Sequence, residues 1–162
     1  MKYKNKINLE GQDKSYIENI LLSSYKHLDT LYILSKNCSN LFEGFCDFKY
    51  GGNWNTSHVK NMSLMFANSK FTGDISKWDV SSVKSMSGMF LYSVFNGDIS
   101  NWDVSNVEDM CGIFQYSLFN SDISNWDVSN VEDMRYMFEY SKFTGDISKW
   151  NLSKNIDFKN IF

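Results

Sequence analysis

The chain has 162 residues and a formal net charge of -3, and 43% of its residues are hydrophobic. That balance excludes an intrinsically disordered chain, and the length fits a single domain. The longest apolar runs are far shorter than the ~18 residues that a membrane helix needs, and the N-terminus lacks the hydrophobic core of a secretion signal. We therefore expect a cytoplasmic protein that makes no membrane contact.

Residues 1–37 precede the regular part of the sequence and are expected to form an N-terminal cap. Ile17, Ile20 and Leu21 are spaced as one face of a helix, and Asp13 is a suitable N-cap residue. They predict an amphipathic helix over about residues 14–29. A cap is needed because the end of a repeat stack would otherwise expose its core and its strand edge.

A 24-residue repeat occupies the rest of the chain, residues 38–162, in about five units. The register continues without insertion from residue 54 to the end. The tryptophans mark it as Trp54, Trp78, Trp102, Trp126 and Trp150, and one set of phenylalanines marks it as Phe66, Phe90, Phe114, Phe138 and Phe162.

The first half of each unit has the apolar spacing of a short helix. Val107, Met110 and Phe114 lie at i, i+3 and i+7, which predicts a helix of about two to three turns. Ser105 and Glu108 have the spacing of a capping box at the start of that helix.

The second half of each unit reads as a short strand, because Trp126 and Val128 alternate with the polar Asp127. One unit cannot bury its own apolar face, so neighbouring units must stack with their strands parallel. The predicted fold class is therefore an α/β repeat. We expect a leucine-rich-repeat-like solenoid of 24-residue units, each a short helix plus short parallel strands, with the N-terminal helical cap.

The repeat pattern V-x-x-M-x-x-M-F-x-x-S-x-F-x-G-D-I-S-x-W-D-V-S resembles the BspA-like leucine-rich repeats of bacterial surface proteins. The resemblance covers roughly residues 38–162, and four units match closely from Val59 onward. It implies a solenoid used for protein binding or adhesion, with no catalytic residues to carry over.

Catalytic chemistry has little support in the residues. His27 and His58 belong to no recognisable motif, and the three cysteines lack the spacing of a metal site. We therefore predict no enzyme activity, no cofactor and no metal. Two aspartate columns raise calcium as an alternative to structural roles, which we favour. The first column is expected to bind turn amides: Asp74, Asp98, Asp122 and Asp146. The second is expected to serve the start of the helix: Asp79, Asp103 and Asp127.

The middle of the chain is acidic, since residues 74–146 carry 4 basic and 12 acidic side chains. That charge argues against direct nucleic-acid binding and favours a protein partner with a basic surface. An alternative is that the acidic stack imitates nucleic-acid phosphates and occupies the basic groove of a nucleic-acid-handling protein.

Positions that differ between units are the candidates for partner binding, since packing accounts for the shared ones. Stacked tyrosines beside aliphatic residues would form an aromatic ridge, or alternatively cover the seam between helices. The candidates comprise this ridge (Leu91, Tyr92, Val94, Tyr116, Leu118, Tyr140), two acidic residues (Glu108, Asp109) and a polar strand-side surface (Asn101, Asp103, Asn125, Asp127).

These features predict a non-enzymatic protein–protein interaction module, and a stand-alone intracellular inhibitor of a protein target is one form that it can take. The alternative is a self-assembling structural protein or a cell-surface adhesion protein. The chain ends at Ile161 and Phe162 in the middle of a unit, so self-association through the C-terminal end is a further expectation.

Overall fold

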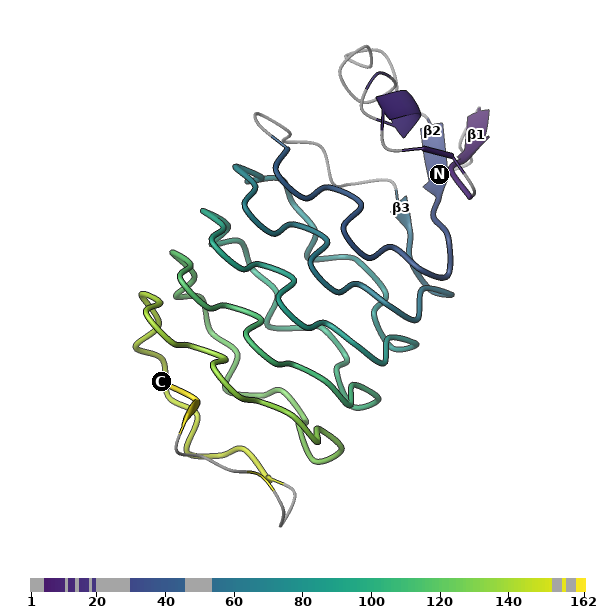
Figure 1. Cartoon of the computed structure of the whole chain (residues 1–162). Coiled ribbons are helices and arrows are strands. Elements are labelled where there is room, and N and C mark those ends of the chain that lie inside the picture. Colours follow the sequence, from purple (N-terminus) through teal and green to yellow (C-terminus); the bar gives the residue numbers. More distant parts are fainter. Residues whose placement is uncertain are drawn as a thin grey trace.

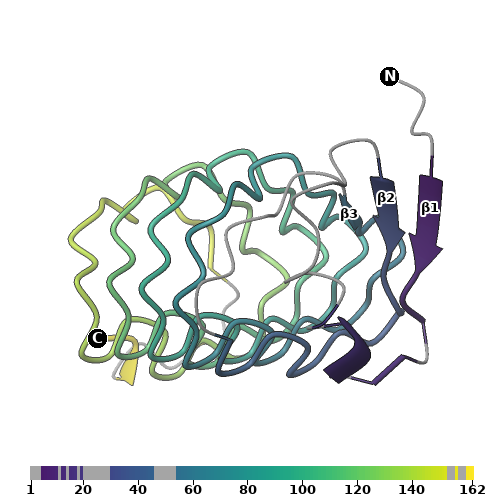
Figure 2. The same cartoon turned by 90° about the horizontal axis from the view of Figure 1, so that it is seen from above.

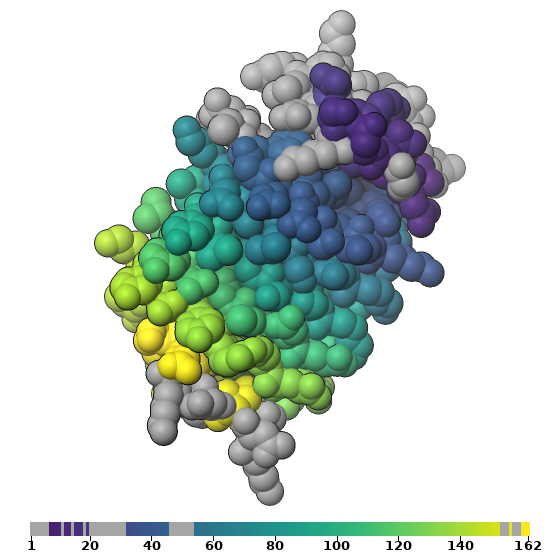
Figure 3. Space-filling model, in the orientation of Figure 1, coloured from purple at the N-terminus to yellow at the C-terminus, as the bar shows by residue number. Residues whose placement is uncertain are grey.

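The computed structural model describes residues 5–10, 12–13, 15–17, 19, 30–45, 54–152, 156 and 160–162. The chain winds in successive coils of 24 residues that stack along one axis (Figure 1). Equivalent segments of neighbouring coils run side by side and in the same direction (Figure 2). Successive coils therefore occupy successive bands of the molecular surface (Figure 3).

The N-terminal end of the stack is closed by a parallel sheet. Strands β1 (Asn5–Asn8), β2 (Thr30–Ile33) and β3 (Trp54–Asn55) lie in the order β1-β2-β3. The predicted helical cap is therefore wrong, because β1 covers the free edge of β2. Of the predicted helix 14–29, residues 15–17 and 19 are helical and the remainder lies outside the described residues. Asp13 does cap this short stretch, since its carboxylate accepts the Tyr16 amide at 2.7 Å.

The predicted helix-plus-strand leucine-rich-repeat-like solenoid is also wrong. The segment expected to be helical consists of overlapping turns, and residues 126–128, expected to be a strand, do not form one. The amides of Met89 and Leu91 donate to carbonyls three residues earlier, at 3.0 Å each. Between them, the amide of Phe90 donates to Ile113 in the next coil, at 2.9 Å. In a helix every one of these amides would donate to a carbonyl of the same helix. In this segment every second amide instead donates to a carbonyl of the next coil. We call residues 86–93 and their equivalents the turn segment.

Residues with positive φ explain why the turn segment does not become a helix. Gly88 (φ 60°) and Tyr92 (φ 54°) are each the third residue of a turn, where a left-handed conformation is required in type II turns. One such residue every four positions interrupts the right-handed helix. The same columns contain Asn40, Gly44, Leu64, Asn68, Gly112, Tyr116, Tyr136 and Tyr140, all with positive φ.

Four corners of each coil are fixed by side chains that accept the backbone amide two residues later. In one coil the acceptors are Ser93, Asp98, Asp103 and Asp109, at 3.2, 2.9, 3.1 and 3.0 Å. Short polar side chains hold such Asx and Ser turns, so the sequence places one wherever the chain must change direction. The prediction that Asp74, Asp98, Asp122 and Asp146 bind turn amides is confirmed. Asp79, Asp103 and Asp127, expected to serve a helix start, accept the amides of turns instead.

The predicted capping box is not formed. The Ser105 hydroxyl donates to the Asp103 carboxylate at 2.6 Å, and Glu108 pairs with Lys84 of the preceding coil at 2.5 Å. Both residues serve the corner and the coil-to-coil contact, because there is no helix start for them to stabilise.

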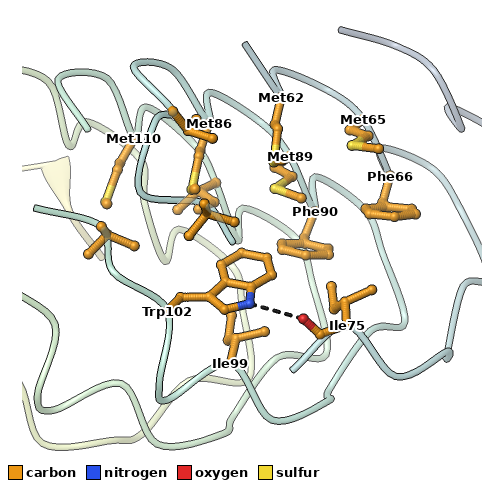
Figure 4. Close-up of a cluster of buried hydrophobic side chains, with 14 of the residues drawn as sticks. Met62, Met65, Phe66, Ile75, Met86, Met89, Phe90, Ile99, Trp102 and Met110 are labelled. Carbon is orange, nitrogen blue, oxygen red and sulfur yellow. Dashed lines mark hydrogen bonds between the residues drawn. The ribbon is translucent and has the colours of Figure 1, made fainter. Parts of the chain in front are cut away.

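The core consists of apolar columns that run through the stack (Figure 4). Phe90 stacks on Phe114 of the next coil, with ring centroids 5.7 Å apart, and on Phe95 of its own coil, at 4.6 Å. Trp102 packs against Phe90 and donates its indole N–H to the Ile75 carbonyl at 3.1 Å. Each coil is thereby joined to the one before it by both packing and a buried hydrogen bond.

Candidate protein-binding surface

Three exposed tyrosines form a continuous stack at the end of the turn segment. The rings of Tyr92 and Tyr116 lie 4.6 Å apart, and those of Tyr116 and Tyr140 lie 4.8 Å apart, nearly parallel in both pairs. Their exposed fractions are 52%, 40% and 71%. We call these residues the tyrosine ladder. The structure therefore brings together the aromatic residues that the sequence selected.

The backbone of the tyrosine ladder is held in an unfavourable conformation. All three tyrosines have φ between 53° and 56°, and the equivalent residue of the preceding coil, Asn68, has φ 55°. Asparagine tolerates the left-handed region, whereas a bulky residue there costs roughly 1–3 kcal/mol. Stacking of the rings offsets part of that cost, by about 0.5–1.5 kcal/mol per pair. Strain of this kind concentrates at functional sites, which makes the tyrosine ladder the strongest candidate surface.

Stacking also decides which part of each ring a partner can reach. Tyr116 has Tyr92 on one face and Tyr140 on the other, so only its edge and hydroxyl group remain accessible. The face of the Tyr116 ring is therefore closed to a sugar ring or a cation, which would bind over an aromatic face. The accessible edge and hydroxyl group suit apolar and hydrogen-bonding groups of another protein.

Aliphatic residues extend the tyrosine ladder. Val94 is 37% exposed and Leu118 is 50% exposed, while Leu91 is partly buried. Leu118 is fixed by its amide, which donates to the Ser93 carbonyl of the preceding coil at 3.1 Å. These side chains complete the aromatic and aliphatic ridge expected from the sequence. The prediction that helices lie beneath the ridge is wrong, because turn segments lie there.

The environment of Tyr116 raises the pKa of its phenol. Desolvation raises the pKa of its phenol, and the neighbouring phenols of Tyr92 and Tyr140 raise the pKa further. The central hydroxyl group therefore stays protonated and remains a hydrogen-bond donor at any physiological pH.

A charged column lies at the other end of the turn segment. In order along the stack it contains Lys36, Lys60, Lys84, Glu108 and Glu132, all exposed. Their backbones are joined directly, each amide donating to the preceding carbonyl at 2.7–2.9 Å. We call the surface between this charged column and the tyrosine ladder the turn face.

Asp109, predicted with Glu108 as an acidic contact, is partly buried at a corner of the coil. Its carboxylate accepts the Cys111 amide at 3.0 Å and the Ser85 hydroxyl at 3.1 Å. Glu108 is exposed and pairs with Lys84. The two acidic residues are therefore adjacent, but Asp109 is largely committed to holding the chain.

The strand-side residues are exposed but lie away from the tyrosine ladder, beyond the next corner of the coil. Asn101 and Asn125 have exposed side chains, and Asp103 and Asp127 accept the amides of their own corners at 3.1 Å. Hydrogen bonds from the Ser129 hydroxyl and amide lower the pKa of Asp127. These residues form a second, purely polar surface.

Sequence reasoning missed Tyr136, which is 39% exposed on the turn face. It occupies the column that contains Leu64, Gly88 and Gly112, so a large aromatic residue replaces glycine there. This departure from the smaller residues of the column was the available signal.

The described residues show no group of three or more histidine, cysteine, aspartate or glutamate side chains arranged to hold a metal ion. His58 contacts the Leu34 carbonyl through Nε2 at 2.6 Å, as Asn106 and Asn130 contact carbonyls of their preceding coils. Burial raises the pKa of Cys38 to about 12. Within the described part of the chain, no helix is long and apolar enough to cross a membrane.

Comparison with known proteins identifies a family without an assigned activity. No curated protein and no solved structure matches the chain. Residues 36–141 and 92–162 match the family model described as "Mycoplasma protein of unknown function, DUF285". Because these matches together extend over most of the sequence, the chain belongs to the DUF285 family.

Proposed function

We propose that this protein is a non-enzymatic protein-binding module and that the tyrosine ladder is the centre of its contact surface. The observation that carries the proposal is the placement of three large aromatic side chains at strained, exposed positions where Asn68 would suffice. Tyrosine is enriched among residues that dominate binding energy, because it offers apolar area and a polar tip together.

The distribution of exposed apolar side chains supports the same surface. Most of the large exposed hydrophobic residues in the described chain lie on the turn face or at its edge: Tyr92, Val94, Tyr116, Leu118, Tyr136 and Tyr140. Apolar patches that remain exposed on a folded protein mark interaction sites.

Two further features indicate the kind of partner. The resemblance of the repeat to BspA-like repeats favours protein binding or adhesion over catalysis. Glu108, Glu132 and Glu139 make the C-terminal part of the turn face acidic, which favours a partner with a basic surface. A nucleic-acid-binding protein blocked by these carboxylates is one such partner.

The test compares partner capture by the parent chain with capture by Tyr116→Asn. Asparagine is the residue that this chain itself uses at the equivalent position 68, so the substitution relieves the left-handed backbone while removing the central ring. The immobilised protein is exposed to a lysate of the cells that produce it, and captured proteins are identified by mass spectrometry. Tyr16→Asn is the matched control, because Tyr16 is 46% exposed but lies in the N-terminal cap.

We expect Tyr116→Asn to lose the partner that the parent and Tyr16→Asn retain. For a central contact the affinity should fall by about 2 kcal/mol or more, roughly 30-fold. Equal capture of the same partner by all three proteins would reject the tyrosine ladder as the contact surface. The strand-side residues Asn101, Asp103, Asn125 and Asp127 would then be examined next.

A further inference from the structure

The charged column changes sign halfway along the stack. Lys36, Lys60 and Lys84 lie in the first coils, and Glu108 and Glu132 lie in the following ones. The spacing is one coil throughout, because backbone hydrogen bonds connect each member to the next. The turn face therefore has a basic end and an acidic end.

Reversing the direction of such a column sets opposite charges against each other at four of its five members, all except Lys36. When two columns are placed antiparallel about the midpoint between Lys84 and Glu108, each Lys84 faces Glu108 of the other column and each Lys60 faces Glu132. The arrangement has twofold symmetry, so the same pairs form twice. A parallel arrangement would instead oppose like charges, which disfavours it.

We propose that the turn face binds a second copy of this chain, with the two coil stacks antiparallel. This inference rests on the proposed function, since it identifies the basic partner of the same surface as another molecule of the protein itself. The basic surface that the acidic end requires is present on the chain, at Lys36, Lys60 and Lys84.

The apolar residues of the turn face fit the same symmetry. About the same midpoint, Tyr92 lies opposite Tyr116 of the second copy, and Leu64 lies opposite Tyr136. Gly88 lies opposite Gly112 at the centre, where both are buried, residue 88 against the Leu64 side chain and residue 112 beside that of Gln115. The symmetry therefore sets apolar residues of one copy against apolar residues of the other around this centre.

The repeat distance also favours a second copy over an unrelated surface. The ring spacings of 4.6 and 4.8 Å in the tyrosine ladder match the spacing of neighbouring parallel chains, about 4.8 Å. Residues along a single extended strand are separated by about 3.3 Å, so a bound peptide would lose register with the tyrosines. A second stack of the same coils keeps register at every position.

The charges and the aromatic residues have different roles in this complex. Lys84 and Glu108 are each about half exposed and already form an ion pair within one chain. Replacing that ion pair by one between two chains therefore contributes little affinity. Their arrangement instead selects the antiparallel orientation and accelerates association at low salt. The tyrosine ladder and its apolar neighbours supply the affinity.

Sedimentation velocity of two charge-reversed variants tests the proposal. Lys60→Glu with Lys84→Glu makes most of the charged column acidic, and Glu108→Lys with Glu132→Lys makes it entirely basic. We expect the parent to dimerise, each variant alone to dissociate at least tenfold more readily, and an equimolar mixture of the two to recover the dimer. Circular dichroism and thermal unfolding check that both variants fold. Tyr116→Asn should also weaken the parent dimer at least tenfold, and Tyr16→Asn should leave it unchanged.

Three outcomes overturn the proposal: a parent that stays monomeric at its highest attainable concentration, variants that dimerise as readily as the parent, or a mixture that stays monomeric while the parent dimerises. The proposed function is judged separately by the capture experiment. A monomeric parent that captures a different protein through Tyr116 rejects the second copy and keeps the binding module. A monomeric parent whose capture does not depend on Tyr116 rejects both.

Discussion

Trp102 donates its indole N–H to the Ile75 carbonyl of the preceding coil, 3.1 Å away, while its ring lies in the core. Trp126 and Trp150 repeat the bond to Ile99 and Ile123 at 3.1 and 3.0 Å. One side chain thus fills the core and satisfies a buried carbonyl across a coil boundary. This dual role explains why tryptophan, rather than another aromatic residue, recurs in the column.

Substitution of Trp102 separates its two contributions. Trp102→Phe should lower the free energy of unfolding by about 0.5–1.5 kcal/mol, because it removes the indole hydrogen bond while the Ile75 carbonyl still accepts the Trp78 amide at 3.0 Å. Trp102→Ala should lower it by about 3–5 kcal/mol, because it also leaves a cavity. Urea unfolding measures both. Equal free energies for the parent and Trp102→Phe would show that the hydrogen bond contributes nothing.

The aspartate corners predict a loss of stability in acid. Hydrogen bonds from Ser100 and from Ser124 lower the pKa of Asp98 and Asp122 below the ordinary value of 3.8. Because the unfolded chain takes up these protons more readily, their stabilisation is intact above about pH 4 and disappears as the pH falls through the lowered values. Urea unfolding between about pH 5 and pH 2 should show this decline.

The double variant Asp98→Asn with Asp122→Asn is the control for that decline. An amide oxygen can still accept the corner amide, as Asn55 accepts the Ser57 amide at 3.3 Å, but it does not titrate in this range. The variant should therefore lose less stability than the parent on acidification. An identical pH profile would mean that other carboxylates cause the decline.

Two glycines distinguish backbone strain from steric contact. Gly44 and Gly88 have φ 72° and 60°, so alanine at either should cost about 1–2 kcal/mol. A Cβ atom at residue 44 would meet nothing within 4 Å, whereas one at residue 88 would lie 2.6 Å from Leu64 Cδ2. Thermal unfolding should show Gly88→Ala to be the more destabilising. Leu64→Ala in the same chain should remove the difference, and its persistence would contradict the contact.

Cysteine labelling should report the opening of the first complete coil. The Cys38 thiol is buried, donates to the Ser35 carbonyl at 3.0 Å, and has a pKa raised to about 12. Alkylation at about pH 8 should therefore modify Cys111, which is partly exposed, well before Cys38. Mass spectrometry of peptides measures both rates. Similar rates in the folded protein would show that this coil opens readily.

The 24-residue period, the buried columns and the corner aspartates were predictable, because each depends on residue type at a fixed spacing. The conformation between corners was not. Val107, Met110 and Phe114 have helical spacing, yet the left-handed φ of Gly112 and Tyr116 turns the segment into successive turns. A repeated tyrosine gives no sequence signal for positive φ, since only glycine and asparagine commonly adopt it.

The ridge residues were found for a related reason. Tyr92, Tyr116 and Tyr140 differ from Asn68, and variation between otherwise identical units indicates a position that packing does not restrict. The stacking of their rings, and the alignment of lysines and glutamates into one column with a basic and an acidic end, depend on how the coils lie against each other. Both required the three-dimensional arrangement.

Hydrogen bonds between residues 24 positions apart limit how this chain can change in length. Loss of a single residue within a coil, such as Ser87, would shift the remaining corners of that coil relative to their partners in the preceding coil. Removal of a whole unit, residues 84–107, would place Glu108 next to Val83 and bring equivalent side chains together again. Gene-level expansion and contraction of the protein should therefore proceed in whole coils. During folding, a coil that docks one unit out of place is the principal competing structure, because most of its contacts would be nearly the same.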